Sequence, residues 1–462
     1  MPAFQSLATL SAAVADGALS PRQIIDGYLD RIARFDQKLH AFVSVYADEA
    51  RAVADAAGEA IRAGHRIGPL HGLPIALKDL VDMEGRVTTG GSAVWRGRVS
   101  PSTAVLAERL IAAGMIVIGK THTVEFAMGG WGTNHHMGTP WNPWDGEVQR
   151  IPGGSSSGSG VSVAAGLTAS AIGTDTGGSV RLPAAFCGHV GLKVSIGRIP
   201  TLGVLPLSHT LDTPGPMTRT VEDAALLYRV LQGPDAREPR TQGLSYEDPM
   251  PTLKRGVAGL RLAAMPGVDR AICEPEVLAA YDASLQTFRS LGARVQQVAL
   301  PYRLNDLGVA LGRIIGGDGY YHVGKLVDNP NLPIDPAVRP RIWVGKGMPA
   351  TAYIAALDEQ QRIKREFAEA LAGYDALLTP TTATAAIPVA AVDQMDTPAV
   401  LTRFVNLIEG CAVAMPNGFT QQGLPTSLQI VCAGEQEAMA LRLAYAFEAA
   451  TDFGGHVPPA VA

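Results

Sequence analysis

Two patterns in the spacing of apolar residues alternate along this chain of 462 residues. In some segments apolar residues recur every third or fourth position, which is typical of amphipathic helices, and elsewhere short apolar runs indicate buried strands. Helices are predicted at residues 1–15, 20–35, 48–63, 103–113, 221–231, 275–291, 307–326, 350–371 and 435–450. Strands are predicted at residues 41–46, 115–118, 260–264, 294–300, 375–378 and 429–432. Because helices and strands alternate, we expect one large α/β domain with a central mixed β-sheet covered by helices on both faces.

One stretch, residues 152–181, follows neither period because it is rich in glycine and serine. It holds two serine-bearing glycine loops, at residues 153–158 and 173–181. The small apolar residues between them, 161–172, predict a buried helix followed by a buried strand. Glycine in such loops indicates positive φ or backbone amides held close to a ligand. Two loops on one rigid unit can converge, and we expect the active site where they meet.

Composition and charge narrow the functional classes. The net charge is −5 and the chain has no basic block, which argues against a nucleic-acid partner. No apolar run is long enough to cross a membrane, and the N-terminus lacks the basic segment of a signal peptide, so we expect a cytoplasmic protein. None of the four cysteines belongs to a C-x-x-C pair, which argues against a zinc site and fits a reducing compartment.

Residues 114–121 match the P-loop pattern G-x-x-x-x-G-K-T. A P-loop needs a strand before its first glycine and a helix after its threonine. Here a predicted helix precedes Gly114, and four apolar strand formers follow it. We therefore interpret the segment as a helix that ends at Gly114 and leads into a buried strand, without a nucleotide.

Residues 154–158 match G-x-S-x-G, the nucleophile elbow of α/β-hydrolases. In that elbow Ser156 is the nucleophile and follows directly on a strand, whereas residues 145–152 are polar and interrupted by proline. His456 is the base that such an enzyme would use, and it lies in a tail rich in glycine and proline. The Ser156–His456 enzyme is kept as a rival hypothesis.

Other histidines are weaker candidates for chemistry. His135 and His136 are adjacent and have no carboxylate motif beside them, so we interpret them as part of a loop surface or a pocket wall. His122 and Glu125 are three residues apart and are interpreted as a structural hydrogen bond.

A serine nucleophile without a suitable histidine needs another base. A buried lysine can serve, because burial disfavours its charged form and lowers its pKa. Lys78 ends an apolar run and is the first candidate, and Lys193 is the second.

The two serine loops resemble the amidase signature family. Residues 153–158 and 173–184 match its glycine- and serine-rich motif, and Ser155 and Ser179 stand 24 residues apart, like the two catalytic serines of that family. Further blocks are similar at residues 76–79, 119–121, 125–129, 141–145, 186–188, 191–193, 212–219, 417–420 and 423–425. The resemblance implies a single amidase signature domain over residues 1–462, with a variable, specificity-determining region at about 234–400.

The resemblance also implies roles for individual residues. Ser179 is the expected nucleophile, Ser155 the bridging serine held by a cis peptide bond, and Lys78 the base. Asp175 and Arg181 are interpreted as a structural ion pair that shapes the loop. The expected oxyanion hole consists of Thr176, Gly177 and Gly178. The expected substrate-binding main chain consists of Met128, Gly129 and Gly130.

These features predict a hydrolase that cleaves the carbonyl C–N bond of a linear amide through an acyl-enzyme. Its expected partner is a small-molecule amide or carbamate, with no metal and no cofactor, and a homodimer is compatible with the sequence. Aromatic residues either line the cleft, which favours aryl amides or carbamates, or belong to the core or to an interface. These aromatic residues are Trp131, Trp141, Trp144, Tyr320, Tyr321 and Trp343.

Two alternative functions stay open. One is a glutamine amidase subunit of a tRNA-dependent amidotransferase. Leu182 argues against it, because that subunit often has glutamine after the arginine of the signature. The other alternative is a catalytically silent binding protein on the same fold.

Overall fold

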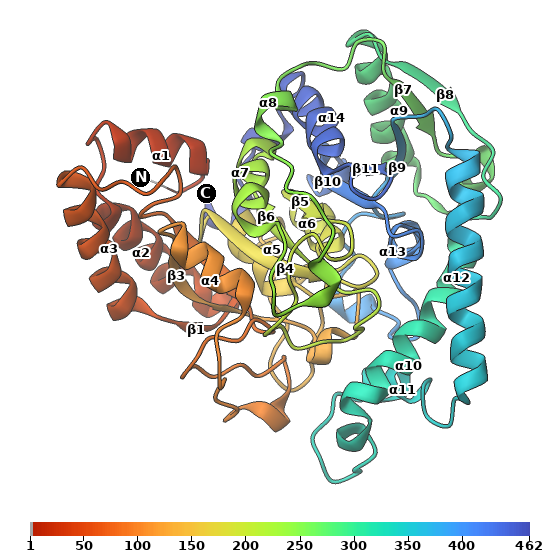
Figure 1. The fold of residues 1–462 in the computed structure, drawn as a ribbon, viewed down its shortest axis with the longest axis horizontal. Helices are drawn as coiled ribbons and strands as arrows, with labels where there is room; N and C mark the ends of the chain where they lie inside the picture. The colour runs from red at the N-terminus through yellow and green to blue at the C-terminus, as the bar shows by residue number, and fades with distance from the viewer. Residues whose placement is uncertain (1–2) are drawn as a thin grey trace.

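A mixed sheet of eleven strands forms the centre of the molecule in the computed structural model, which describes residues 3–462 (Figure 1). Across the sheet the strands run in the order β1-β3-β2-β4-β6-β5-β10-β11-β9-β7-β8. Strand β2 is parallel to both β3 and β4, and β7 is parallel to β8 and β9, while the other neighbours are antiparallel. The strands are β1 (Phe42–Val45), β2 (Pro74–Lys78), β3 (Ile116–Thr121), β4 (Ser170–Asp175), β5 (Val190–Lys193), β6 (Thr213–Thr218), β7 (Arg261–Ala264), β8 (Arg294–Gln297), β9 (Ala376–Pro380), β10 (Cys411–Phe419) and β11 (Pro425–Cys432).

Helices pack on the sheet in two groups. Helices α5 and α6 pack against each other and against the central strands, whereas α7, α9 and α14 form a second group over the same strands (Figure 1). The predicted α/β domain with a covered mixed sheet is therefore confirmed. The helices are α1 (Leu7–Ala15), α2 (Pro21–Leu39), α3 (Ala47–Arg62), α4 (Val105–Ala112), α5 (Ser157–Ala164), α6 (Arg181–Cys187), α7 (Val221–Leu231), α8 (Met250–Leu253), α9 (Pro275–Ser290), α10 (Gly308–Val327), α11 (Arg339–Trp343), α12 (Ala350–Ala370), α13 (Arg403–Leu407) and α14 (Glu437–Ala449).

Helices α10, α11 and α12 lie at the end of the molecule opposite α1, α2 and α3 (Figure 1). Helix α10 packs against α11, α12 and α13, so this group forms a wall beside the sheet. Within residues 3–462, the structure has no helix that is long and apolar enough to cross a membrane.

Each of the nine predicted helices is present in the described residues, and the start of α2 follows local capping chemistry. The Ser20 side chain accepts a hydrogen bond from the Gln23 amide while the Gln23 side chain accepts one from the Ser20 amide, a capping box that starts α2. The helix expected at residues 1–15 begins at Leu7, and its residues 1 and 2 lie outside the described part of the chain. The stretch at 234–254, which has the composition of a linker, contains α8 packed against α14 and α7.

Four strands, β2, β5, β6 and β10, are not among the predicted strands, and all of them are buried almost completely. Strand β6 has the sequence TPGPMT, and proline cannot donate to a ladder of hydrogen bonds. Strand β5 pairs only with Met217 and Thr218, so the missing N–H groups of Pro214 and Pro216 fall outside that ladder. On the other side both prolines lie in register with β4, Pro214 opposite Thr174 and Pro216 opposite Ile172.

The residues predicted for the active site are positioned by β2, β4 and α5. Strands β2 and β4 are parallel neighbours in register at Ala76 and Ala171, so their carboxyl ends meet at one edge of the sheet. Helix α5 packs on both strands. The first serine loop leads into α5 and the second serine loop follows β4, so both loops reach the edge where β2 ends at Lys78.

Candidate active site

Lys78 is the last residue of β2, and its side chain is fully buried. Its Nζ donates hydrogen bonds to Ser155 Oγ and to Thr174 Oγ1, each at 2.8 Å. The neighbouring Asp79 does not pair with it and instead faces Lys120, with 3.7 Å between Oδ1 and Nζ. Lys78 is therefore a buried lysine held by two hydroxyl groups.

Ser155 lies in the first serine loop and is also fully buried. The peptide bond between Gly154 and Ser155 is cis. The Gly154 amide donates to the Gly130 carbonyl at 2.7 Å, and a Cβ added to Gly154 would lie only 2.7 Å from the Gly132 nitrogen. Only glycine fits at this close contact. The hydrogen bond between Gly154 and Gly130 joins the loop that holds Ser155 to the main chain around residue 130.

Ser179 lies in the second serine loop, between β4 and α6, and is 8% exposed. The loop is organised by Asp175 at the end of β4. Its carboxylate accepts hydrogen bonds from the amides of Gly178 at 2.8 Å and Val180 at 3.2 Å, and from the Arg181 guanidinium at 2.9 and 3.0 Å. Burial alone would raise the pKa of Asp175, but the Arg181 guanidinium holds that pKa well below its usual range.

Arg181 connects this loop to distant parts of the chain. Its other donors reach the Thr402 carbonyl at 2.8 Å, Gln429 Oε1 at 2.7 Å and Asn406 Oδ1 at 2.7 Å. All five N–H groups of the guanidinium are therefore used, and neither Arg181 nor its carboxylate partner is accessible to solvent. The interpretation of this pair as structural is supported by these contacts.

The backbone amides of the second loop differ in how they are used. The Gly178 amide is engaged by Asp175, so Gly178 anchors the loop instead of presenting a free donor as expected. Among residues 3–462, the amides of Thr176, Gly177 and Ser179 have no hydrogen-bond partner. Three free amides thus remain beside the Ser179 side chain.

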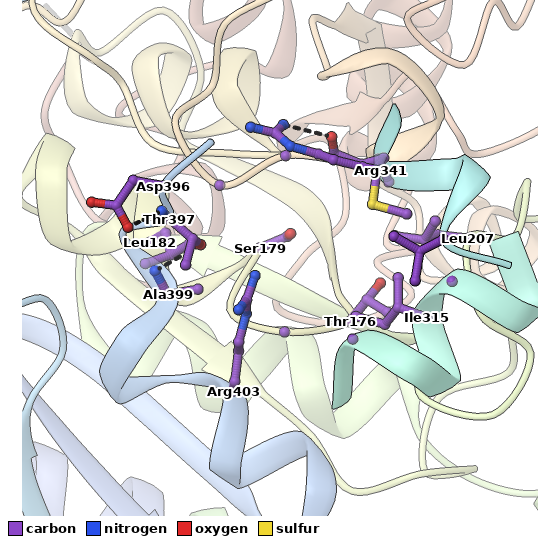
Figure 2. Close-up of a pocket in the computed structure, with 18 of the residues that line it drawn as sticks. Thr176, Ser179, Leu182, Leu207, Ile315, Arg341, Asp396, Thr397, Ala399 and Arg403 are labelled. Atoms are coloured by element: carbon purple, nitrogen blue, oxygen red, sulfur yellow. Dashed lines mark hydrogen bonds between the residues drawn. The ribbon is translucent and has the colours of Figure 1, made fainter. Parts of the chain in front are cut away.

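A cavity of about 400 Å³ opens over this loop. Figure 2 shows Ser179 between Leu182 and Ala399 on one side and Thr176 and Ile315 on the other. The structure brings the residues predicted for the oxyanion hole and the substrate wall into one place, with the exception of Gly178. The predicted residues that line this cavity are Ser179, Thr176, Gly177, Met128, Gly129 and Gly130.

The ionisation of Lys78 is set by its surroundings. Burial lowers the pKa of Lys78 to about 7, and the carboxylates of Asp212 and Asp175 oppose that shift. Burial also raises the pKa of Asp212 to about 6, although hydrogen bonds from Thr176 Oγ1 and the Ser208 amide act to lower it. A substantial fraction of Lys78 is therefore neutral near pH 7, as a base requires.

Sequence reasoning missed several residues of the site. Thr174 holds Lys78, and Asp212 opposes the lowering of its pKa. Arg341 and Arg403 line the cavity from α11 and α13, more than 150 residues from Ser179 in the chain. Arg341 donates to the Met128 carbonyl at 3.2 Å and to the Gln394 carbonyl, so it clamps two loops of the wall.

The rival elbow arrangement is absent from the described residues 3–462. Ser156 is fully buried and donates to the Thr174 carbonyl at 3.3 Å, and no strand precedes it. His456 is exposed and packs on the Phe419 ring, with 4.6 Å between centroids. The two side chains do not form a catalytic pair.

The P-loop match and the second candidate lysine also have structural explanations. Gly114 follows α4 with a φ of +83°, and the next residues form the buried strand β3, so the P-loop match is a helix end as interpreted. Lys193 donates to the carbonyls of Val194 at 3.0 Å and Gly410 at 2.8 Å and does not bond either serine.

The expected bond between His122 and Glu125 is wrong. The His122 ring packs against the His40 ring in a tilted arrangement, with 4.1 Å between centroids. Glu125 instead accepts hydrogen bonds from Ser92 Oγ and from the Asp335 amide, both at 2.6 Å. His135 is exposed on a loop, as interpreted, and within residues 3–462 no cluster of three or more potential metal ligands occurs.

None of the six aromatic residues considered as cleft residues lines the cavity at Ser179. Trp131 packs in a separate cluster with Phe186, and Trp144 packs against Phe419. Tyr320 and Tyr321 line a different cavity of about 760 Å³. Trp131 and Trp144 are therefore core residues, whereas Trp343 is exposed away from this cavity.

Comparison with known proteins agrees with the fold and with the predicted family. A family model described as Amidase matches residues 23–441. A glutamyl-tRNA(Gln) amidotransferase subunit from Chromohalobacter salexigens is 34% identical over 475 residues, covering 97% of this chain and 97% of that protein. The structure of native peptide amidase from Stenotrophomonas maltophilia superposes with a TM-score of 0.84 at 29% identity, covering 96% of each chain. A bacterial aryl acylamidase gives 0.89 at 25% identity, covering 99% of each chain.

Fold and site thus define an enzyme that acts on amide C–N bonds. The chain belongs to the amidase family, whose signature is carried by its two serine loops.

Proposed function

We propose that this enzyme hydrolyses the carbonyl C–N bond of a linear amide through an ester on Ser179. The observation that carries the proposal is the 2.8 Å contact between Lys78 Nζ and Ser155 Oγ, in a site where burial lowers the pKa of Lys78 to about 7. A neutral amine at this position accepts a proton from Ser155, and Ser155 in turn accepts the proton of Ser179. Ser155 relays the proton because Lys78 is sealed from the cavity.

The proposed reaction proceeds in two halves. Ser179 Oγ forms a bond to the carbonyl carbon, and its proton moves to Ser155 as the proton of Ser155 moves to Lys78. The C–N bond then breaks, and the leaving amine or ammonia receives a proton back along the same path. Water repeats these steps on the ester, so the acid leaves and Ser179 regains its proton.

The negative charge that develops on the carbonyl oxygen needs donors placed in advance. The free amides of Thr176, Gly177 and Ser179 lie beside the nucleophile and supply them in this proposal. The Gly178 amide acts indirectly, because its bond to Asp175 holds the loop in shape. Loss of one such donor lowers the rate on the order of 10²- to 10³-fold in comparable enzymes.

The proposal is tested by replacing Lys78, Ser155 and Ser179 with alanine, one at a time. Substrates are aliphatic amides, aryl amides, carbamates and glutamine. Each variant is expected to lose on the order of 10³-fold or more in kcat. His456→Ala is the control, and it is expected to leave activity unchanged. Activity that survives Lys78→Ala and disappears with His456→Ala would support the Ser156 enzyme instead.

A second candidate function is the glutamine amidase subunit of an amidotransferase. It is favoured by the 34% identity to the Chromohalobacter salexigens protein over nearly the full length of both chains. Such a subunit hands ammonia to a partner protein, so the chain alone would release little ammonia from simple amides. Full turnover of simple amides by the isolated chain, without any added partner, therefore favours the independent hydrolase. A silent binding protein is disfavoured by the intact contact between Lys78 and Ser155.

A further inference from the structure

Arg403 is a cation without a partner in the wall of the cavity. It is the first residue of α13, it is half-buried, and Figure 2 shows its guanidinium pointing into the cavity towards Ser179. Among residues 3–462, its guanidinium has no hydrogen bond and no ion pair. A Cβ added to Gly177 would lie 3.6 Å from Arg403 Cγ, so the stem of this arginine lies against the nucleophile loop.

The other charged groups of the cavity do not neutralise Arg403. Arg341 is occupied by carbonyl groups, and Arg313 pairs with Glu359 at 3.4 Å on the exposed rim. The only acidic residue in the described lining is Asp396, which is exposed and not within ion-pair distance of Arg403. Burial and the charge of Arg341 both lower the pKa of Arg403, against a weaker attraction from Asp396.

We infer that Arg403 binds a carboxylate on the substrate, so that the preferred substrate is an amide that carries a negative charge. The inference rests on the proposed function of the same cavity and names its substrate class. A guanidinium presents two parallel N–H donors that match the two oxygens of a carboxylate. A cation left half-buried without a partner is costly, and an anionic substrate supplies the missing partner on binding.

The charge balance of the cavity also selects among carboxylates. Three arginines and one exposed aspartate line it, so a substrate with a carboxylate and no ammonium group fits better than a zwitterion. Glutaramate and glutamine differ only by the ammonium group, and pentanamide is the neutral counterpart of glutaramate. Comparison of these three compounds therefore separates the effect of the carboxylate on kcat/KM from the effect of the ammonium group.

The test measures kcat/KM for malonamate, succinamate and glutaramate, each beside its neutral analogue without the carboxylate, and for glutamine. The wild-type enzyme is expected to prefer the best carboxylate over its neutral analogue by on the order of 10- to 100-fold. Arg403→Gln is expected to remove that preference by lowering kcat/KM for the carboxylates, because a neutral amide offers no group that pairs with the guanidinium. Arg403→Lys keeps the positive charge but loses the planar guanidinium with its parallel N–H donors. It is expected to retain part of the preference for carboxylates. Arg289→Gln removes an exposed arginine at the end of α9 and is the matched charge control.

Binding provides a second measurement that does not depend on turnover. Calorimetry on the Ser179→Ala enzyme, with and without Arg403→Gln, compares the same carboxylates with their neutral analogues. The inference is wrong if no carboxylate is turned over or bound better than its neutral analogue, or if Arg403→Gln leaves the preference intact. A failure of the proposed function looks different, because amide hydrolysis would then survive Ser179→Ala.

Discussion

Thr174 Oγ1 lies 2.8 Å from Lys78 Nζ, the same distance at which Ser155 Oγ lies from that nitrogen. Thr174 belongs to β4 and Lys78 to β2, so the contact joins two parallel neighbouring strands. The amine is thereby held from two directions. Ser155 faces it as the proposed proton relay, and Thr174 fixes its orientation, which makes Thr174 a positioning residue.

Replacing Thr174 with valine removes this hydroxyl at nearly constant volume. We expect kcat to fall on the order of tenfold, because one hydrogen bond of this kind contributes roughly 1 kcal/mol or slightly more. The midpoint of the acid limb is expected to move to lower pH, since the charged amine loses an acceptor. Steady-state kinetics over a pH series measures both effects. Thr174→Ser restores the hydroxyl and is expected to restore activity, whereas a merely structural role would leave the pH midpoint in place.

The pH dependence follows from the pKa of Lys78, which burial lowers to about 7. The base must be neutral, so activity is lost as Lys78 becomes protonated below that pH and reaches a plateau above it. For a neutral amide, log kcat/KM is expected to fall about one unit per pH unit on the acid side. A flat profile from about pH 5 to about pH 9, with chemistry rate-limiting, would contradict a lysine base.

Asp212 offers a way to move that midpoint. Its carboxylate is ionised above a pKa of about 6 and raises the pKa of Lys78 by attraction, against the larger effect of burial. Asp212→Asn removes the attraction, so the acid limb is expected to shift to lower pH and the enzyme to keep more activity at about pH 6. Asp212→Glu keeps the charge and serves as the control. An acid limb that shifts upwards, or stays in place, would show that Asp212 does not act on Lys78.

The ion pair of Asp175 and Arg181 is expected to contribute to stability, because both side chains are fully buried. Arg181→Met leaves the carboxylate without its main partner and is expected to lower the free energy of unfolding by about 3–5 kcal/mol. Urea unfolding measures the loss, and Arg289→Met on the surface is the control. The double variant Asp175→Asn/Arg181→Met is expected to lose less than the sum of the two single variants. Additive losses would contradict a coupled pair.

The parts of the fold that sequence predicts are those with a visible period. Helices α2, α9 and α12 have one buried face each, and their patterns are clear. Strands β5 and β10 are buried on both faces, so their apolar runs carry no alternation. Strand β6 contains two prolines, which by themselves argue against a central strand. These strands exist because neighbours far away in the chain pair with them.

The residues of the candidate site likewise fall into those that the sequence reveals and those that only the folded chain reveals. Ser155 and Ser179 stand in glycine-rich loops whose composition is unusual, and Lys78 ends an apolar run, so all three are visible in the sequence. Arg403 and Arg341 have no local signal, because their role depends on helices that reach the nucleophile only in the folded chain. Thr174 and Asp212 are missed because their importance comes from contact with one buried amine.

The lining of the cavity comes mainly from two stretches of chain. Residues 127–182 contribute Ser179 and its loop, residues 309–403 contribute much of the wall, and Leu207 adds to it from between them. Mutations in the second stretch reshape the wall of the cavity, but Thr402 and Arg403 also contact the loop of Ser179, since Thr402 bonds Gly177 and Arg181 and Arg403 packs on Gly177. Libraries for directed evolution are therefore best confined to α10 and α11, where they would explore new amides without replacing Thr402 and Arg403.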